Sequence, residues 1–143
     1  MPSSSRKPVA FVGLVALIGA CSSGGPRLTD AQQRERYAAY AGSPVDSFTW
    51  LGRFYSWQTL GDNQLVVFTT PSDAYLLTVQ APCNDLPFTQ TVGVSATAGT
   101  VHARLDSVTV KGWRCPITQI RPVDYARMRA DLRSEAQKPK SSG

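Results

Sequence analysis

Hydrophobic and polar positions change their spacing along the chain, and these changes divide it into predicted segments. Residues 9–20 form an uninterrupted run of apolar and small side chains. Residues 31–41 have the spacing of one helical face, whereas residues 45–121 alternate or cluster their apolar positions as β-strands do. Helical spacing returns over residues 123–136. The pattern predicts a β-rich domain with one helix at each end.

The first predicted helix carries a start signal and a stop signal. Thr29 stands where an N-cap is expected, and Gln32, three residues later, gives the spacing of a capping box. Tyr37, Ala38 and Ala41 are expected to share one face of this helix. The Gly-Ser-Pro sequence after Ala41 ends it, because proline cannot continue a helix. We therefore expect one short helix before the strands.

The central segment predicts a series of short strands separated by turns. Phe48, Trp50 and Phe54 alternate with other residues, which indicates one strand with an apolar face. Pro122 is expected to end the last strand, since proline cannot donate a ladder hydrogen bond. Such spacing favours a small antiparallel β-sheet or barrel of about six strands with an N-terminal and a C-terminal helix. The further strands are expected at residues 64–69, 74–80, 91–96, 100–104, 107–111 and 116–121.

The N-terminal apolar run has the features of an export signal. Arg6 and Lys7 precede it without any acidic residue. Residues 9–20 are too few to span a bilayer, which takes about 20 apolar residues, but they suffice for a signal peptide. The sequence Ile-Gly-Ala-Cys that ends at Cys21 matches a lipobox, where a bacterial signal peptide is cut and the cysteine is lipidated. The alternatives are a buried N-terminal helix and an ordinary cleaved signal with an incidental cysteine.

Acylation of Cys21 would anchor the chain to the lipid bilayer. Each buried lipid CH₂ contributes about 0.8 kcal/mol, so several acyl chains such as palmitate anchor a protein durably. Ser22 follows the cysteine, and the absence of aspartate there favours the outer membrane over the inner membrane. We therefore expect a lipoprotein of the bacterial cell envelope, held at the outer membrane and facing the periplasm.

This interpretation divides the chain into successive parts. Residues 1–20 are the expected lipoprotein signal peptide, and residues 21–28 a lipidated tether that keeps the domain within about 20 Å of the membrane. Residues 29–136 are expected to form a single β-rich domain, because a chain of this length corresponds to one domain. Residues 137–143 are expected to be a disordered tail.

Two cysteines remain once Cys21 is taken by lipid. Cys83 and Cys115 would lie in an oxidising compartment, where such a pair most simply forms a disulfide. In the chain-entropy model the closed loop adds about 3–4 kcal/mol to the stability of the domain. The alternatives are a redox pair and a metal site, but the chain has no Cys-x-x-Cys motif, and only His102 could join the cysteines as a ligand. We expect a structural disulfide.

Charge narrows the expected partners. The formal net charge is +5, which is mildly basic and is not typical of a nucleic-acid-binding protein, so no nucleic acid is expected. Much of the excess lies near the C-terminus, as either a solvated helix face or a patch that meets anionic lipid headgroups or cell-wall polymer. The residues concerned are Arg127, Arg129, Arg133, Lys138 and Lys140.

The sequence offers little for catalysis. Its one histidine is His102, and it contains no nucleophile elbow, zinc-protease or phosphate-loop motif. Its aspartates fall at predicted turns and element edges, where aspartate caps backbone amides. A hydrolase would need two of these acids, or one with His102, to converge. We expect no catalytic residue, no metal and no cofactor, and hence not an enzyme.

Arg121 and Asp124 flank Pro122 at the predicted boundary between the last strand and the helix. An arginine leaving the strand would pair with an aspartate that opens the helix, where a carboxylate also complements the helix dipole. We predict a structural ion pair that fixes the C-terminal helix on the sheet.

Four aromatic residues are candidates for a ligand or partner surface: Trp50, Tyr55, Trp57 and Trp113. Aromatic side chains on a β surface stack on sugar rings or anchor a protein partner. The alternative is that they pack in the core. Trp50 and Trp57 are expected on opposite faces if one unbroken strand runs through both.

Several stretches are distinctive in combination. They are residues 37–48 (Tyr-Ala-Ala-Tyr-Ala-Gly-Ser-Pro-Val-Asp-Ser-Phe), Trp57 with Leu-Gly at 60–61, Ala-Tyr-Leu-Leu at 74–77, Cys83, Cys-Pro-Ile at 115–117 and Ile-Arg-Pro-Val-Asp at 120–124. Together they resemble a family of small, uncharacterised proteobacterial lipoproteins that is classed as a domain of unknown function. The resemblance implies a lipoprotein with one domain and paired cysteines, and no catalytic residue transfers from it.

Three functional hypotheses follow. The leading one is a membrane-anchored envelope lipoprotein whose domain is a structural or protein-interaction module. The alternative is a module that binds cell-wall glycan or a small apolar ligand, which predicts a concave site lined by at least two of the four aromatic residues. The third is an unrecognised hydrolase.

Overall fold

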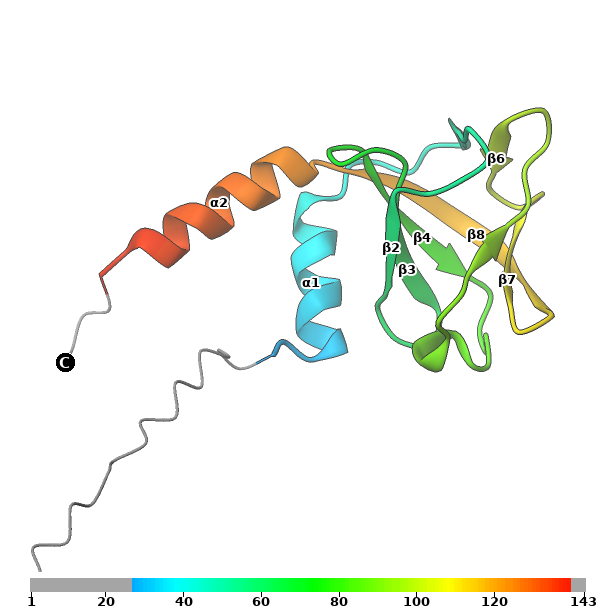
Figure 1. Cartoon of the computed structure of the whole chain (residues 1–143), viewed down its shortest axis with the longest axis horizontal. Helices are drawn as coiled ribbons and strands as arrows, with labels where there is room; N and C mark the ends of the chain where they lie inside the picture. Colours follow the sequence, from blue (N-terminus) through cyan, green and yellow to red (C-terminus); the bar gives the residue numbers. More distant parts are fainter. Residues whose placement is uncertain (1–26, 140–143) are drawn as a thin grey trace, which may run out of the picture.

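The computed structural model describes residues 27–139 and contains eight strands in two antiparallel sheets, with one helix near each end of that region. Six strands form one sheet that curls into a half-barrel, which confirms the predicted mainly β fold (Figure 1). Cys21 and the expected signal peptide and tether up to residue 26 lie outside the described residues, as do residues 140–143. The elements are α1 (Asp30–Tyr40), β1 (Ser47–Thr49), β2 (Ser56–Thr59), β3 (Gln64–Phe68), β4 (Ala74–Val79), the 3₁₀ turn η1 (Leu86–Phe88), β5 (Gly93–Val94), β6 (Thr100–His102), β7 (Ser107–Val110), β8 (Trp113–Val123) and α2 (Tyr125–Gln137).

Helix α1 begins as its capping signal predicts. The Thr29 side chain accepts a hydrogen bond from Gln32 N at 3.3 Å, and the Gln32 side chain accepts one from Thr29 N at 2.9 Å. Tyr37 is buried on the predicted inner face, but Ala38 is exposed. Consecutive helix residues lie about 100° apart, so a helix that turns Tyr37 inward over the sheet turns Ala38 toward solvent.

The strand predicted to run from Phe48 to beyond Phe54 is split in two. β1 ends at Thr49 and β2 begins at Ser56. Gly52 lies between them with a φ of 92°, a left-handed conformation that glycine adopts without steric penalty. The single-strand prediction was therefore wrong: β1 pairs with β6, and β2 pairs with β3. Each later predicted strand is present, as β3 to β8.

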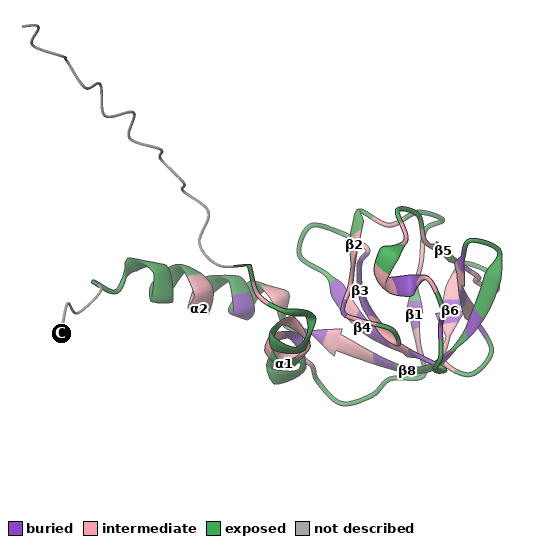
Figure 2. Ribbon diagram, turned by 90° about the horizontal axis from the view of Figure 1, so that it is seen from below, coloured by how far each residue is buried: buried purple, intermediate pink, exposed green. Residues whose placement is uncertain are grey.

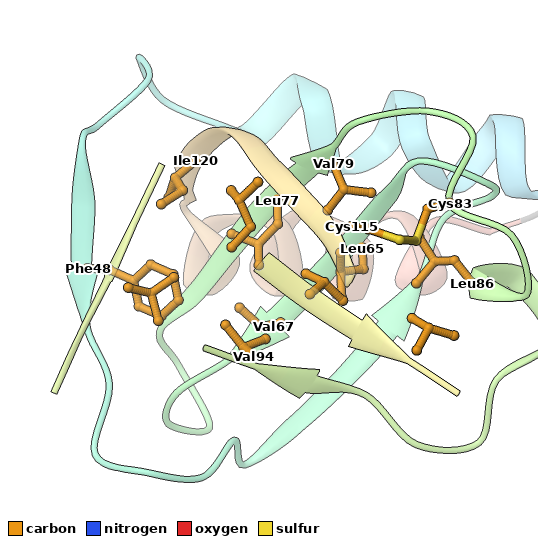
Figure 3. Packing of buried hydrophobic residues seen from close by; sticks show 14 residues of the cluster. Phe48, Leu65, Val67, Leu77, Val79, Cys83, Leu86, Val94, Cys115 and Ile120 are labelled. Carbon is orange, nitrogen blue, oxygen red and sulfur yellow. A yellow bond between two sulfur atoms is a disulfide. The ribbon is translucent and has the colours of Figure 1, made fainter. Parts of the chain in front are cut away.

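The central strands bury side chains on both faces of the sheet. In β3, Leu65 and Val67 belong to the core inside the half-barrel, whereas Val66 and Phe68 belong to a second core under the two helices. Side chains alternate along a strand, so one strand contributes to both cores. Figure 2 shows burial running along the central strands, and Figure 3 shows the inner core.

A disulfide joins Cys83, in the loop after β4, to Cys115, near the start of β8 (Figure 3). The two Cα atoms lie 5.7 Å apart, and both side chains are buried. The pairing predicted from the cysteine count is thus confirmed, and it ties a loop to a late strand as expected.

Strand β8 continues through Pro122, so the predicted strand break there was wrong. Pro122 O accepts a hydrogen bond from Gly42 N at 2.8 Å, and Ile120 O accepts one from Val45 N at 2.9 Å. The backbone N and O of a strand residue face the same side. The nitrogen of Pro122 therefore faces the segment before β1, and its missing N–H removes no bond from the pairing with β4.

Helix α2 begins directly after β8 and projects away from the sheet (Figure 1). Its N-cap is Asp124, whose carboxylate accepts a hydrogen bond from Arg127 N at 3.1 Å. Met128 is buried and Leu132, one turn later, is half-buried. Most of the rest of the helix is exposed (Figure 2). The first turns thus attach α2 to the domain.

Candidate functional site

Strand β2 is one edge of the large sheet, whose order is β2-β3-β4-β8-β7-β5. Leu60 N donates to Gln64 O at 2.8 Å. Because hydrogen-bonded and non-bonded pairs alternate in an antiparallel ladder, Trp57 and Thr59 direct their backbone N–H and C=O away from β3. Among residues 27–139, no strand pairs with β2 on that side.

The pairing of β3 with β4 also shows that the backbone groups of Trp57 point away from β3. Trp57 lies opposite Val67 in β3. Thr69 N donates to Asp73 O at 3.0 Å, so Thr69 and Asp73 form a hydrogen-bonded pair. Hydrogen-bonded pairs recur at every second position of the β3–β4 ladder. Val67 therefore exchanges its backbone hydrogen bonds with Tyr75 of β4. The backbone groups of Trp57 remain outward at the edge of the sheet.

A cleft of about 330 Å³ lies on the side of β2 that faces the helices; we call it the helix-side cleft. It is lined by Tyr37, Tyr55, Ser56, Trp57, Gln58, Phe68, Pro71, Tyr125 and Arg129. The rings of Phe68 and Tyr125 meet edge to face, with centroids 4.8 Å apart. The Arg129 guanidinium lies over the Tyr125 ring, 5.8 Å from its centroid. The cleft is thus an aromatic surface that includes one cation.

A polar contact inside this cleft ties α1 to β2. Tyr37 Oη donates to Gln58 Oε1 at 3.1 Å, and Gln58 Nε2 donates to Gln33 Oε1. Burial raises the pKa of Tyr37 to about 12, with a further increase from the nearby Tyr125. The phenol is therefore neutral at ordinary pH and acts as a hydrogen-bond donor.

A second cleft, of about 390 Å³, lies between the two edge strands β2 and β5; we call it the seam cleft. It is lined by Trp50, Gly52, Arg53, Phe54, Trp57, Val92, Gly93 and Val94. The rings of Trp50 and Phe54 stack with centroids 5.1 Å apart. Trp50 Nε1 is buried and has no hydrogen-bond partner among the described residues. Trp57 lines both clefts, so the two meet at one residue of the edge strand.

The structure brings three of the four predicted aromatic residues together. Trp50, Tyr55 and Trp57 line these two clefts, whereas Trp113 lies in the β7–β8 hairpin, is 65% exposed and lines neither. The expectation that Trp50 and Trp57 lie on opposite faces required one unbroken strand, and that condition is not met, because β1 ends at Thr49 and β2 begins at Ser56.

The sequence did not point to four of the cleft residues, namely Tyr37, Phe54, Phe68 and Tyr125. Arg129 was expected only as part of a basic C-terminal patch. Tyr125 and Arg129 are four residues apart on α2, a spacing that places them on one helix face and was visible in the sequence. Which surface that face meets depends on how α2 leaves β8, and no local pattern encodes this.

A family model matches residues 4–139, which includes the whole of the fold described above. The chain belongs to DUF6491, a family of unknown function. No curated protein and no solved structure matches the chain significantly. Membership in DUF6491 confirms the expected assignment to an uncharacterised family.

The ion pair predicted between Arg121 and Asp124 is not formed in this DUF6491 domain. Arg121 instead donates to two backbone carbonyls, from Nε to Gly42 O at 2.8 Å and from Nη2 to Ala41 O at 2.9 Å. The Asp124 carboxylate caps α2. Among residues 27–139 the ion pairs are Lys111–Asp85 and Arg127–Asp131. The prediction was wrong because α1 ends beside β8 and offers the guanidinium the unpaired carbonyls of a helix end.

One acidic side chain is buried among residues 27–139 of the DUF6491 domain. Asp106 is buried and accepts hydrogen bonds at 2.7 Å from Ser95 Oγ and from His102 N, which ties the β6–β7 turn to the segment after β5. His102 itself is half-buried on β6.

Residues 27–139 contain no group of three or more His, Cys, Asp or Glu side chains placed to hold a metal ion. Within the same region no helix is long and apolar enough to cross a membrane.

Proposed function

We propose that this chain is an exported lipoprotein, anchored through acylated Cys21 at the periplasmic face of the outer membrane, and that its domain binds a protein partner without catalysis. The export signal and lipobox in the sequence support the anchor. The Cys83–Cys115 disulfide fits an oxidising compartment outside the cytoplasm. The described domain begins at Arg27, a few residues after Cys21, so the anchor holds it close to the membrane surface.

The anchor has a direct test with two matched variants. Cells grown with an alkyne-labelled palmitate are expected to label the wild-type chain and not Cys21→Ser, which moves to the soluble periplasmic fraction. Ser22→Asp is expected to keep the label and shift the protein to the inner-membrane fraction. Label on Cys21→Ser, or a wild-type chain that fractionates with soluble proteins, would contradict the anchor.

The observation that carries the binding activity is the pair of clefts that share Trp57. Aromatic residues and arginine are enriched at the cores of protein interfaces. The aromatic side chains supply large contact areas with few mobile torsions. Each cleft includes one arginine, Arg129 or Arg53, and neither is lined by an acidic residue. The surface is thus suited to hold an apolar partner, and it offers no carboxylate for acid–base chemistry.

Photocrosslinking in growing cells tests this activity. A photoreactive benzoylphenylalanine at Tyr55, which is 65% exposed at the helix-side cleft, is expected to form adducts with one or a few discrete proteins. The same residue at Leu105, which is 80% exposed and lines neither cleft, is the matched control. Adducts that are absent at Tyr55, or identical at the two positions, would overturn the proposal.

One observation favours a second candidate, a glycan or a small apolar ligand in the seam cleft. The buried Trp50 Nε1 has no hydrogen-bond partner within residues 27–139, and an unsatisfied buried donor costs about 1–3 kcal/mol. A ligand with an apolar ring and an acceptor oxygen would remove that cost. Titration with soluble peptidoglycan fragments, followed by tryptophan fluorescence, is expected to quench the wild-type signal and not that of Trp50→Phe. Equal responses of the two proteins would exclude this site.

A further inference from the structure

We infer that the partner binds as an extended peptide that adds a strand to the free edge of β2. This inference rests on the protein-binding function proposed above and names how that binding occurs. It has three supports: the backbone groups of β2, the two clefts on either side of it, and the charge of those clefts.

The first support is the backbone of β2. The N–H and C=O groups of Trp57 and Thr59 point away from β3, and residues 27–139 provide no strand to pair with them. Natural edge strands are usually protected by lysine, proline, a bulge or short length. The sequence of β2, Ser-Trp-Gln-Thr, contains no charge and no proline. The opposite edge strand, β5, is only two residues long. β2 is therefore the open edge of this sheet.

The second support is the position of the clefts. An added strand would continue the sheet beyond β2, and its successive side chains would point to alternate faces. The helix-side cleft lies on the outer face of β2, and the seam cleft lies on its inner side, between β2 and β5; Trp57 lines both. Alternate residues of the peptide would therefore enter alternate clefts. Because both clefts are aromatic, the peptide needs consecutive apolar residues rather than an alternating apolar and polar pattern.

The third support is charge. Arg129 lines the helix-side cleft and Arg53 lines the seam cleft, whereas no acidic side chain lines either. An acidic residue at each end of the apolar run would complement these arginines. The occupant is thus an extended segment of a partner protein, with a short apolar run flanked by Asp or Glu. Strand addition of this kind takes its affinity from main-chain hydrogen bonds and its specificity from the side-chain pockets.

The first experiment pans a display library of random short peptides against the full chain purified in detergent. Peptides that depend on Trp57, judged by loss of binding to Trp57→Ala, are expected to contain consecutive apolar residues with a flanking acid. The strongest peptide is then synthesised with N-methyl groups at alternate amides, in the two possible registers. N-methylation removes donors without changing side chains, so one register is expected to weaken binding at least about tenfold and the other much less.

A matched pair of protein variants tests the edge of β2 by changing the protein instead of the peptide. Thr59→Pro removes the outward N–H, which the pairing with β3 does not use, and Thr59→Val keeps it. Thr59→Pro is expected to weaken peptide binding about tenfold or more, and Thr59→Val to retain it. The melting temperature of each variant shows whether the domain is folded. The N-methylated peptides test the backbone hydrogen bonds independently, because they are used with the wild-type protein.

The outcomes separate this inference from the function on which it rests. Peptides that bind equally well in both N-methylated registers would show that only side chains are recognised, which overturns strand addition while protein binding stands. A selection that yields no Trp57-dependent peptide, or only peptides that leave the Tyr55 adducts intact, also overturns it. Absence of any protein adduct at Tyr55 removes the proposed function itself. Displacement of the peptide by peptidoglycan fragments would instead identify a glycan as the occupant.

Discussion

Trp50 and Trp57 line the same cleft from the two ends of the β1–β2 connection. Gly52, with its positive φ, lies between them and lets the chain turn between β1 and β2. Trp57 also lines the cleft on the other face of the sheet. One half-buried residue of an edge strand thus lies where two aromatic clefts meet, and it also packs against the core.

Trp57 and Trp113 should differ sharply in their contribution to stability. Trp57 is half-buried and packs against the core of the half-barrel, whereas Trp113 is 65% exposed. We expect Trp57→Ala to lower the free energy of unfolding by about 2–3 kcal/mol and Trp113→Ala by about 0.5 kcal/mol or less. Urea unfolding measures both. Equal losses would show that the packing of Trp57 does not stabilise the fold.

Tyr37 should make the domain sensitive to alkaline pH. Burial raises its pKa from 10.0 to about 12, so the folded state disfavours the phenolate. Its stabilisation is complete below pH 10 and is lost as the pH rises toward 12, because the unfolded state loses the proton first. We expect the free energy of unfolding to fall by about 2–3 kcal/mol over this range. Tyr37→Phe is the control and should show a smaller fall. An unchanged pH profile in that variant would contradict the assignment.

The disulfide should supply a large part of the stability. Cys83 and Cys115 are 32 residues apart in sequence, and closing a loop of that length contributes about 3–4 kcal/mol in the chain-entropy model. The variant Cys83→Ala with Cys115→Ala should therefore unfold at a much lower urea concentration. Wild-type protein unfolded in the presence of a reductant provides the comparison and should match it. A midpoint that does not move in either case would show that the bridge is dispensable.

Arg121 should hold the end of α1 against β8. Its guanidinium donates to the carbonyls of Ala41 and Gly42, and each such charge-assisted bond contributes about 1.5–3 kcal/mol at most. Because Arg121 is partly exposed, we expect Arg121→Ala to cost about 1–2 kcal/mol. Amide hydrogen exchange should quicken in the last turn of α1. Arg114→Ala, at an exposed position of the same strand, is the control. Unchanged exchange in Arg121→Ala would contradict this role.

Asp106 should be needed for the β6–β7 turn. It is buried and accepts from Ser95 Oγ and His102 N, so removing the carboxylate leaves two donors without a partner. We expect Asp106→Ala to lower the free energy of unfolding by about 2–4 kcal/mol. Asp46→Ala, an exposed aspartate in the neighbouring segment, should cost about 0.5 kcal/mol or less. Thermal unfolding of the two variants provides the comparison, and similar melting temperatures would refute the prediction.

The sequence by itself determined the features that depend on local pattern or on counting. The β spacing predicted the class of fold, and the capping box at Thr29 predicted the start of α1, because both depend on residues only a few positions apart. The disulfide followed from there being only two cysteines, Cys83 and Cys115, after Cys21 is set aside. The prediction that Pro122 ends the last strand was wrong, because the side to which its nitrogen points depends on a neighbouring segment.

Only the tertiary structure decided the candidate site. Three of its features depend on strand order and on contacts between distant segments. They are the edge position of β2, the cleft shared by Trp50 and Trp57, and the contact of Arg121 with the end of α1. Side-chain spacing shows which residues share a face of one strand or helix. It does not show which strand lies beside it, because that choice is made by the packing free energy of the whole domain rather than by any short segment.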